Sequence, residues 1–102
     1  MNATLTDKSE NTLASIIIKA REGNLYSGKI EANSFPDCWL NLFKNFQEAV
    51  EDQAFIRVDH LEDRINNLMI FVKLGDASTK KRIRNLQIYD IDSRPQFTFE
   101  CT

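Results

Sequence analysis

Apolar and polar residues alternate along the first third of the chain in a way that predicts two strands joined by a tight turn. Residues 13–21 fit a strand with Ile16 and Ile18 on one side, and they also fit a helix with four apolar side chains on one face. Three consecutive isoleucines favour the strand, because β-branched side chains are stiff and pack well on a pleated sheet. Residues 22–24, Glu-Gly-Asn, suit a tight turn, and residues 25–32 form a second extended run. We therefore predict a β-hairpin.

The next segment has the three- and four-residue spacing of an amphipathic helix, which we expect from about Pro36 to Gln53. Ser34 can cap its first turn, where a proline is also tolerated. We expect its apolar side to cover a sheet, so that Trp39→Ala is severely destabilising. That side consists of Phe35, Trp39, Leu42, Phe43, Phe46 and Val50.

The rest of the chain returns to a period of two, which predicts four more strands. In the third of them the apolar register shifts between Ile83 and Leu86, as a β-bulge would cause. Residues 59–67 fit either a hairpin tip or one to two helical turns, residues 75–79 a loop and residues 93–95 a turn. The four predicted strands cover residues 54–59, 68–74, 82–91 and 97–101.

The resulting order, ββαββββ, predicts an α+β fold in which one amphipathic helix packs on one face of an antiparallel sheet. Residues 1–11 have few apolar side chains, so we predict a flexible N-terminal tail followed by a single domain over residues 12–102. Met69 and Phe71 fall on the outward side of their strand. They would lie either under another layer or in a homo-oligomer contact.

Length, charge and cysteine content argue against several classes of function. A chain of 102 residues is long enough for one core, and a large enclosed substrate cavity would compete with that core for residues. The formal charge of -2 lacks the basic excess of a nucleic-acid binder. Two cysteines, no secretory signal and no apolar run of about 20 residues indicate a cytoplasmic protein with free thiols and no membrane contact.

Charge is distributed unevenly along the chain. Residues 37–63 contain seven acidic and two basic side chains, whereas residues 64–84 contain six basic and one acidic. Acidic side chains gather where the predicted helix ends, although the carbonyl groups there already have partial negative charge, and such local conflicts often mark functional sites. We therefore predict an acidic surface that binds a partner protein with a basic surface, through Glu48, Glu51, Asp52, Glu62 and Asp63.

Two alternatives compete with this interpretation. Arg57, Arg64 and the basic run at residues 80–84 could neutralise the acidic residues within the fold. The basic run could also contact phosphate or an acidic protein patch, although it lacks the interleaved aromatic residues of a single-strand binding platform. This alternative contact consists of Lys80, Lys81, Arg82 and Arg84.

Catalytic and metal-binding patterns are weak. His60 is the single histidine, so a nucleophilic site would have to combine it with Asp59 or Cys38. One histidine among a few carboxylates is too few for a zinc site, and the three glycines are too far apart for a phosphate loop. We therefore predict no enzymatic activity, no metal and no cofactor.

Half of the chain resembles bacterial immunity proteins of the WapI type. The similar segments are residues 23–31, the helix from Trp39 to Val50, and residues 54–57 and 68–74. The resemblance implies a non-enzymatic protein that neutralises a toxin, with the acidic surface facing a basic, nuclease-like partner. We predict a small immunity or inhibitor protein that occludes its partner. The alternative is an accessory subunit of a nucleoprotein or enzyme assembly that uses the basic run.

Overall fold

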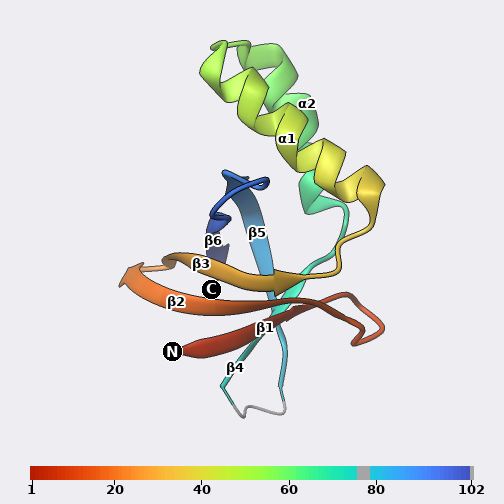
Figure 1. Cartoon of the computed structure of the whole chain (residues 1–102). Coiled ribbons are helices and arrows are strands. Elements are labelled where there is room, and N and C mark those ends of the chain that lie inside the picture. The colour runs from red at the N-terminus through yellow and green to blue at the C-terminus, as the bar shows by residue number, and fades with distance from the viewer. Residues whose placement is uncertain (76–78, 102) are drawn as a thin grey trace.

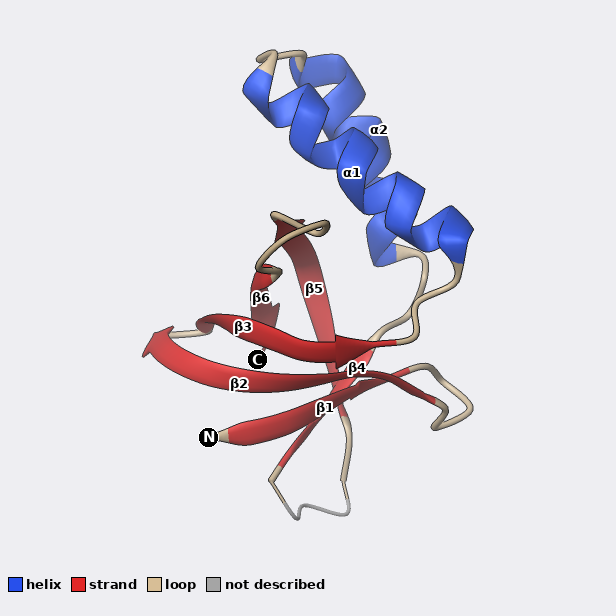
Figure 2. Ribbon diagram, in the orientation of Figure 1, coloured by secondary structure: helices blue, strands red, loops and turns tan. Residues whose placement is uncertain are grey.

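A computed structural model, which describes residues 1–75 and 79–101, shows a closed antiparallel barrel with a pair of helices at one end (Figures 1 and 2). Around the barrel the strands follow the order β1-β2-β3-β6-β5-β4, and β4 pairs with β1 to close it. Helices α1 and α2 form an antiparallel hairpin that connects β3 to β4 (Figure 1). The elements are β1 (Asn2–Thr6), β2 (Thr12–Glu22), β3 (Leu25–Asn33), α1 (Asp37–Glu51), α2 (Phe55–Asn66), β4 (Phe71–Leu74), β5 (Lys81–Tyr89) and β6 (Gln96–Cys101).

The closed barrel corrects the predicted open sheet in the order ββαββββ, and β1 is the main reason. Residues 2–6, predicted as part of a flexible tail, form a strand that pairs with β2 on one side and β4 on the other. Ala3 and Leu5 alternate with polar neighbours, and Leu5 is completely buried. Two inward side chains are enough for so short a strand, because its backbone hydrogen bonds are satisfied on both edges.

The second correction concerns residues 54–59, which were predicted as a strand and belong to the start of α2. Val58, Leu61 and Ile65 follow one another at spacings of three and four residues, and this buried side of α2 packs against the rest of the core. Of the two alternatives for residues 59–67, helical turns are therefore correct. Hence two helices, not one, accompany the strands.

The predicted first helix is present, although its start differs from the expectation. Its N-cap is Pro36, and no side chain caps it. The Ser34 hydroxyl instead donates a hydrogen bond to the carbonyl oxygen of Thr12 (3.1 Å), which ties the entry to α1 back to β2. Phe43 and Phe46 are buried as predicted, since they face the core.

The predicted turn and bulge are both confirmed. Gly23 has a φ of 59°, a conformation that glycine adopts at little cost, and the turn pairs Glu22 with Leu25. In β5 the pairing register with β6 shifts between Arg84 and Gln87, and Asn85 between them has a φ of 55°. Of the loop predicted over residues 75–79, residues 76–78 lie outside the described part of the chain. No helix among the described residues is long and apolar enough to cross a membrane.

The side chains of the Asn85 bulge attach the helical hairpin to the barrel. Asn66, the last residue of α2, accepts a hydrogen bond from the Asn85 backbone N–H (2.8 Å) and donates one to the Asn85 side-chain oxygen (3.1 Å). Asn85 Nδ2 in turn donates to Glu100 on β6 (2.7 Å). These bonds fix the base of the hairpin against β5 and β6.

The barrel interior and the inner side of the helices form one continuous core. Aromatic rings stack within it: the centroid of Phe99 lies 5.3 Å from that of Tyr26 and 5.3 Å from that of Phe97. The largest completely buried side chains are Phe43, Phe97, Phe99, Leu5, Ile16, Ile88 and Val72.

Two buried polar groups among the described residues lack a hydrogen-bond partner, the Thr6 hydroxyl and the Gln47 side-chain nitrogen, and the first gives a stability prediction. Thr6 is 2% exposed, and within the described residues its hydroxyl makes no hydrogen bond. Thr6→Val replaces the hydroxyl with a methyl group of similar size, so we expect the free energy of unfolding to rise by about 1 kcal/mol. Urea denaturation followed by circular dichroism measures this change. A loss of stability would mean that the hydroxyl is hydrogen-bonded in solution.

Candidate functional site

The far end of the helical hairpin exposes large apolar side chains to solvent. Here α1 ends and α2 begins, at the point most distant from the barrel along both helices (Figure 1). Phe55 is 73% exposed, Ile56 81% and Val50 41%. We call these three residues the hairpin tip. Exposed apolar side chains gathered in one place are typical of binding surfaces.

The short connection between the helices explains why these side chains cannot turn inward. Gln53 has a φ of 56° and its backbone N–H donates to the carbonyl of Val50 (3.1 Å), while the N–H of Ala54 donates to that of Ala49 (3.0 Å). This pair of bonds is the Schellman arrangement, which ends a helix within two residues. The chain enters α2 immediately afterwards, so Phe55 and Ile56 occupy its first turn, beyond the reach of the core.

Three of the predicted partner-binding residues, Glu48, Glu51 and Asp52, lie beside the hairpin tip in the last turns of α1. All three are exposed, and the last turn of α1 contains no basic residue. Among residues 1–75 and 79–101, no ion pair involves any of the five predicted acidic residues. The alternative was that Arg57, Arg64 and the basic run neutralise these carboxylates within the fold. No ion pair among the described residues supports it.

The other two predicted acidic residues lie farther from the tip on α2. Glu62 and Asp63 follow Phe55 and Ile56 by seven residues, which places them on the same sides of α2 and about 10 Å along its axis. Asp63 is exposed and Glu62 is half-buried. The tip thus has carboxylates on both helices, with those of α1 closer to it.

A shallow apolar groove continues from the tip along another side of α2. Phe55, Ile56 and Leu61 line it, and Arg57, His60 and Arg64 border it. The tip therefore has both signs of charge around it. Carboxylates lie on α1 and on part of α2, and Arg57 and Arg64 lie along the groove. A partner for this surface needs an apolar group at its centre.

Two of the four residues of the predicted basic contact, Lys80 and Arg82, make contacts within the fold. Lys80 donates to the carbonyl oxygen of Lys8 (2.7 Å), and its ammonium lies 4.6 Å from the ring centroid of Phe71. Arg82 donates to the carbonyl oxygen of Asn66 (3.3 Å). Phe71 was expected to lie either under another layer or in a contact between two copies of the chain. The Lys80 side chain covers part of its ring. Arg82, Lys81 and Arg84 are all exposed.

The loop that Lys80 contacts is organised by Asp7. Its carboxylate accepts hydrogen bonds from the backbone N–H groups of Ser9 (2.8 Å) and Asn11 (2.9 Å) and from the Asn11 side chain (3.0 Å). The bond from the Asn11 side chain, supported by the backbone bonds, lowers the pKa of Asp7 below its usual value. Asp7 therefore remains ionised near Lys80, which favours the position of that lysine in the fold.

The candidate catalytic residues are not brought together. Cys38 lies in the first turn of α1, next to the barrel, and His60 lies in α2 closer to the tip. The helical rise separates them by on the order of 12 Å along the hairpin. Cys101 is buried, and no cluster of three or more metal-ligating side chains occurs in the part of the chain that the structure describes.

Sequence reasoning missed the apolar centre of this surface. Residues 54–59 were assigned to a strand because their side chains alternate, and Val50 was assigned to the apolar side of α1. The spacing of Val58, Leu61 and Ile65 is the signal that could have found α2, and with it the exposure of Phe55. No family model, curated protein or solved structure matches the chain.

Proposed function

We propose that this chain is a small non-enzymatic binding protein, an immunity or inhibitor protein of the cytoplasm, that occludes a partner protein with its hairpin tip. The exposure of Phe55 (73%) and Ile56 (81%) is the observation that supports this proposal. Burying a large apolar side chain contributes about 1.5–3 kcal/mol. Both side chains stay exposed in the folded chain, so this free energy is gained only when a partner with an apolar pocket buries them.

The carboxylates beside the tip indicate the charge of the partner. Glu48, Glu51 and Asp52 are exposed, and without an ion pair in the described chain they leave a local negative field next to the apolar side chains. Such a field accelerates encounter with a basic surface and disfavours acidic ones. We infer a partner with a basic rim around an apolar pocket, in keeping with the toxin expected from the resemblance to WapI-type immunity proteins.

The proposal is tested by crosslinking from two exposed apolar positions in the native host. A photoreactive amino acid at position 55 should form an adduct with one protein, whereas the same amino acid at Leu25, which is 44% exposed at the β2–β3 turn, should not. The protein captured at position 55 is then purified for affinity measurements. Identical adducts from both positions would contradict the proposal.

We expect the double substitution Phe55→Ala and Ile56→Ala to weaken binding of that partner by about 30-fold or more, because each truncation removes an apolar anchor. The unfolding free energy should change by less than about 0.5 kcal/mol, since both side chains are exposed. Leu25→Ala is the matched control. Charge reversal of Glu48, Glu51 and Asp52 should slow association and reduce its salt dependence. Unchanged affinity of the double variant would overturn the proposal.

A further inference from the structure

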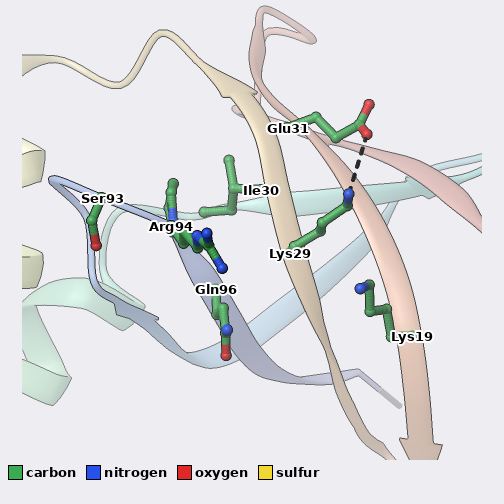
Figure 3. A pocket seen from close by; sticks show the side chains of 8 residues that line it. Lys19, Lys29, Ile30, Glu31, Ser93, Arg94 and Gln96 are labelled. Atoms are coloured by element: carbon green, nitrogen blue, oxygen red, sulfur yellow. Dashed lines mark ion pairs between the residues drawn. The ribbon is translucent and has the colours of Figure 1, made fainter.

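A second concave surface lies on the barrel wall, between β2, β3 and the turn that leads into β6. Figure 3 shows it from close by. Its volume of about 700 Å³ is within the range of small-molecule sites. Lys19 comes from β2, Lys29 and Glu31 from β3, Arg94 from the turn and Gln96 from β6. The hairpin tip contributes nothing to this cleft.

The position of Lys19 follows from an irregularity in the pairing of β2 with β3. Ile18 pairs with Gly28 and Ala20 with Ser27, so Lys19 is the extra residue of a β-bulge. Bulges redirect side chains. In Figure 3 the Lys19 ammonium points toward the cleft. On the opposite strand, Gly28 lies so close to the backbone of Ile17 that no side chain fits between the two strands.

The position of Arg94 follows from a backbone contact. The N–H of Ile30 on β3 donates to the carbonyl oxygen of Pro95 (2.9 Å), which attaches the turn to the edge of the cleft. Figure 3 shows Arg94 facing the cleft from the side opposite Lys19. Two cationic side chains from separate parts of the chain therefore line the same cleft from opposite sides. Lysines scattered over a flat surface would not be arranged in this way.

The charge of this cleft is predominantly positive. Lys19, Lys29 and Arg94 line it together with a single carboxylate, that of Glu31. Glu31 lies 3.9 Å from the Lys29 ammonium, and both side chains are about half exposed, so this pair is weak. Within the described residues Lys19 and Arg94 form no ion pair. An anion entering the cleft would find two cationic groups without such a pair.

A neighbouring hollow extends the cleft along the barrel. It shares Lys19, Lys29 and Gln96 with the cleft, and it reaches Tyr89 on β5 and Thr98 on β6. Arg94 lines only the cleft and Tyr89 only the neighbouring hollow, whereas Lys19, Lys29 and Gln96 line both. Guanidinium and ammonium groups bind phosphate, whereas aromatic rings and amides contact nucleobases.

We propose that this cleft binds a phosphate-bearing ligand of nucleotide size. Lys19, Lys29 and Arg94 contact the phosphate groups, and Tyr89 and Gln96 lie toward the base. The ligand is either a free nucleotide or one nucleotide of a single strand, since both present the same chemistry to the cleft. The proposal is independent of partner binding at the hairpin tip.

Titration of the full-length protein with three probes tests the site: inorganic phosphate, ADP and hexathymidylate. We expect saturable binding of ADP or hexathymidylate that weakens as salt is added, with amide NMR shifts at Lys19, Lys29, Ser93, Arg94 and Gln96. Tighter binding of ADP would identify a free nucleotide as the ligand, and tighter binding of the oligonucleotide a single strand. Binding of inorganic phosphate alone would overturn the nucleotide-sized ligand.

Four variants separate this site from general charge attraction. Lys19→Gln and Arg94→Gln should each weaken binding about tenfold, and Glu31→Gln should strengthen it, because it removes the one carboxylate that lines the cleft. Lys81→Gln, at an exposed lysine outside the cleft, should have no effect.

No saturable binding of any probe at millimolar concentration would overturn the proposal, and so would equal effects of Lys81→Gln and Arg94→Gln. The Phe55→Ala and Ile56→Ala double variant should bind the probes normally, so failure of this proposal is distinguishable from failure of the proposed function.

Discussion

Gly28→Ala is expected to lower the free energy of unfolding by about 3 kcal/mol, because β2 and β3 are too close at this point for any side chain. A Cβ atom on Gly28 would overlap the backbone carbonyl of Ile17 and approach the backbone nitrogen of Lys19 to 3.0 Å. Both are main-chain atoms in paired strands, so neither can move away as the end of a flexible side chain would. The β2 bulge at Lys19 is the cause of this close approach.

Thermal unfolding followed by circular dichroism measures the effect, which corresponds to a lowering of Tm by about 12–24 °C for a domain of this size. Gly23→Ala is the matched control. Gly23 lies in the turn before β3, where nothing lies within 4 Å of its added Cβ, and only its φ of 59° opposes the substitution. We expect a loss of about 1 kcal/mol there. If the two variants were equally stable, the close packing of β2 and β3 at Gly28 would be disproved.

Phe43→Ala is expected to lower the free energy of unfolding by about 3–5 kcal/mol, the usual result of removing a fully buried aromatic ring. Phe43 is 1% exposed, and its ring packs edge-on against Phe35 at a centroid distance of 5.2 Å. It lies where α1 meets the core, so a cavity there would weaken the contact between the helical hairpin and the barrel. Urea denaturation of the variant measures the loss.

Trp39→Ala is the informative comparison, because the sequence predicts it to be severely destabilising. Trp39 is only partly buried at the edge of the core, and its ring centroid lies 6.5 Å from that of Phe35. We therefore expect a smaller loss than for Phe43→Ala. A larger loss for Trp39→Ala would mean that the entry to α1, not its middle, is the main attachment of the hairpin.

The hydrophobic pattern of a single segment was enough to predict the elements that depend on residues close together in the sequence. The three isoleucines and Gly23 were enough to predict the β2–β3 hairpin, and the spacing from Phe35 to Phe46 was enough for α1. The shift between Ile83 and Leu86 even predicted the bulge in β5. Each pattern includes side chains that become buried, Ile16 in β2, Phe43 and Phe46 in α1, and Ile83 and Leu86 in β5, so periodicity and burial agree there.

Barrel closure could not be predicted in this way, because it depends on pairings between distant segments. β1 is recognisable as a strand only once β4 is available on its second edge, and β4 itself has only four residues. The start of α2, residues 54–59, was mistaken for a strand because Phe55 and Ile56 are apolar without being buried. For the candidate site, the sequence indicated the acidic residues that lie beside the tip, whereas it placed Val50 on the buried side of α1 and Phe55 and Ile56 in a strand.

The pairing of β1 with β4 and of β3 with β6 also determines how the chain must fold. Strands β1 to β3 leave the ribosome first and can form a meander, yet both outer edges of that meander stay unpaired until the residues after 70 have been synthesised. Unpaired edges promote association between nascent chains, and contacts between distant segments slow folding. The helical hairpin is synthesised between the two halves, so its early formation shortens the search that brings β4 to β1.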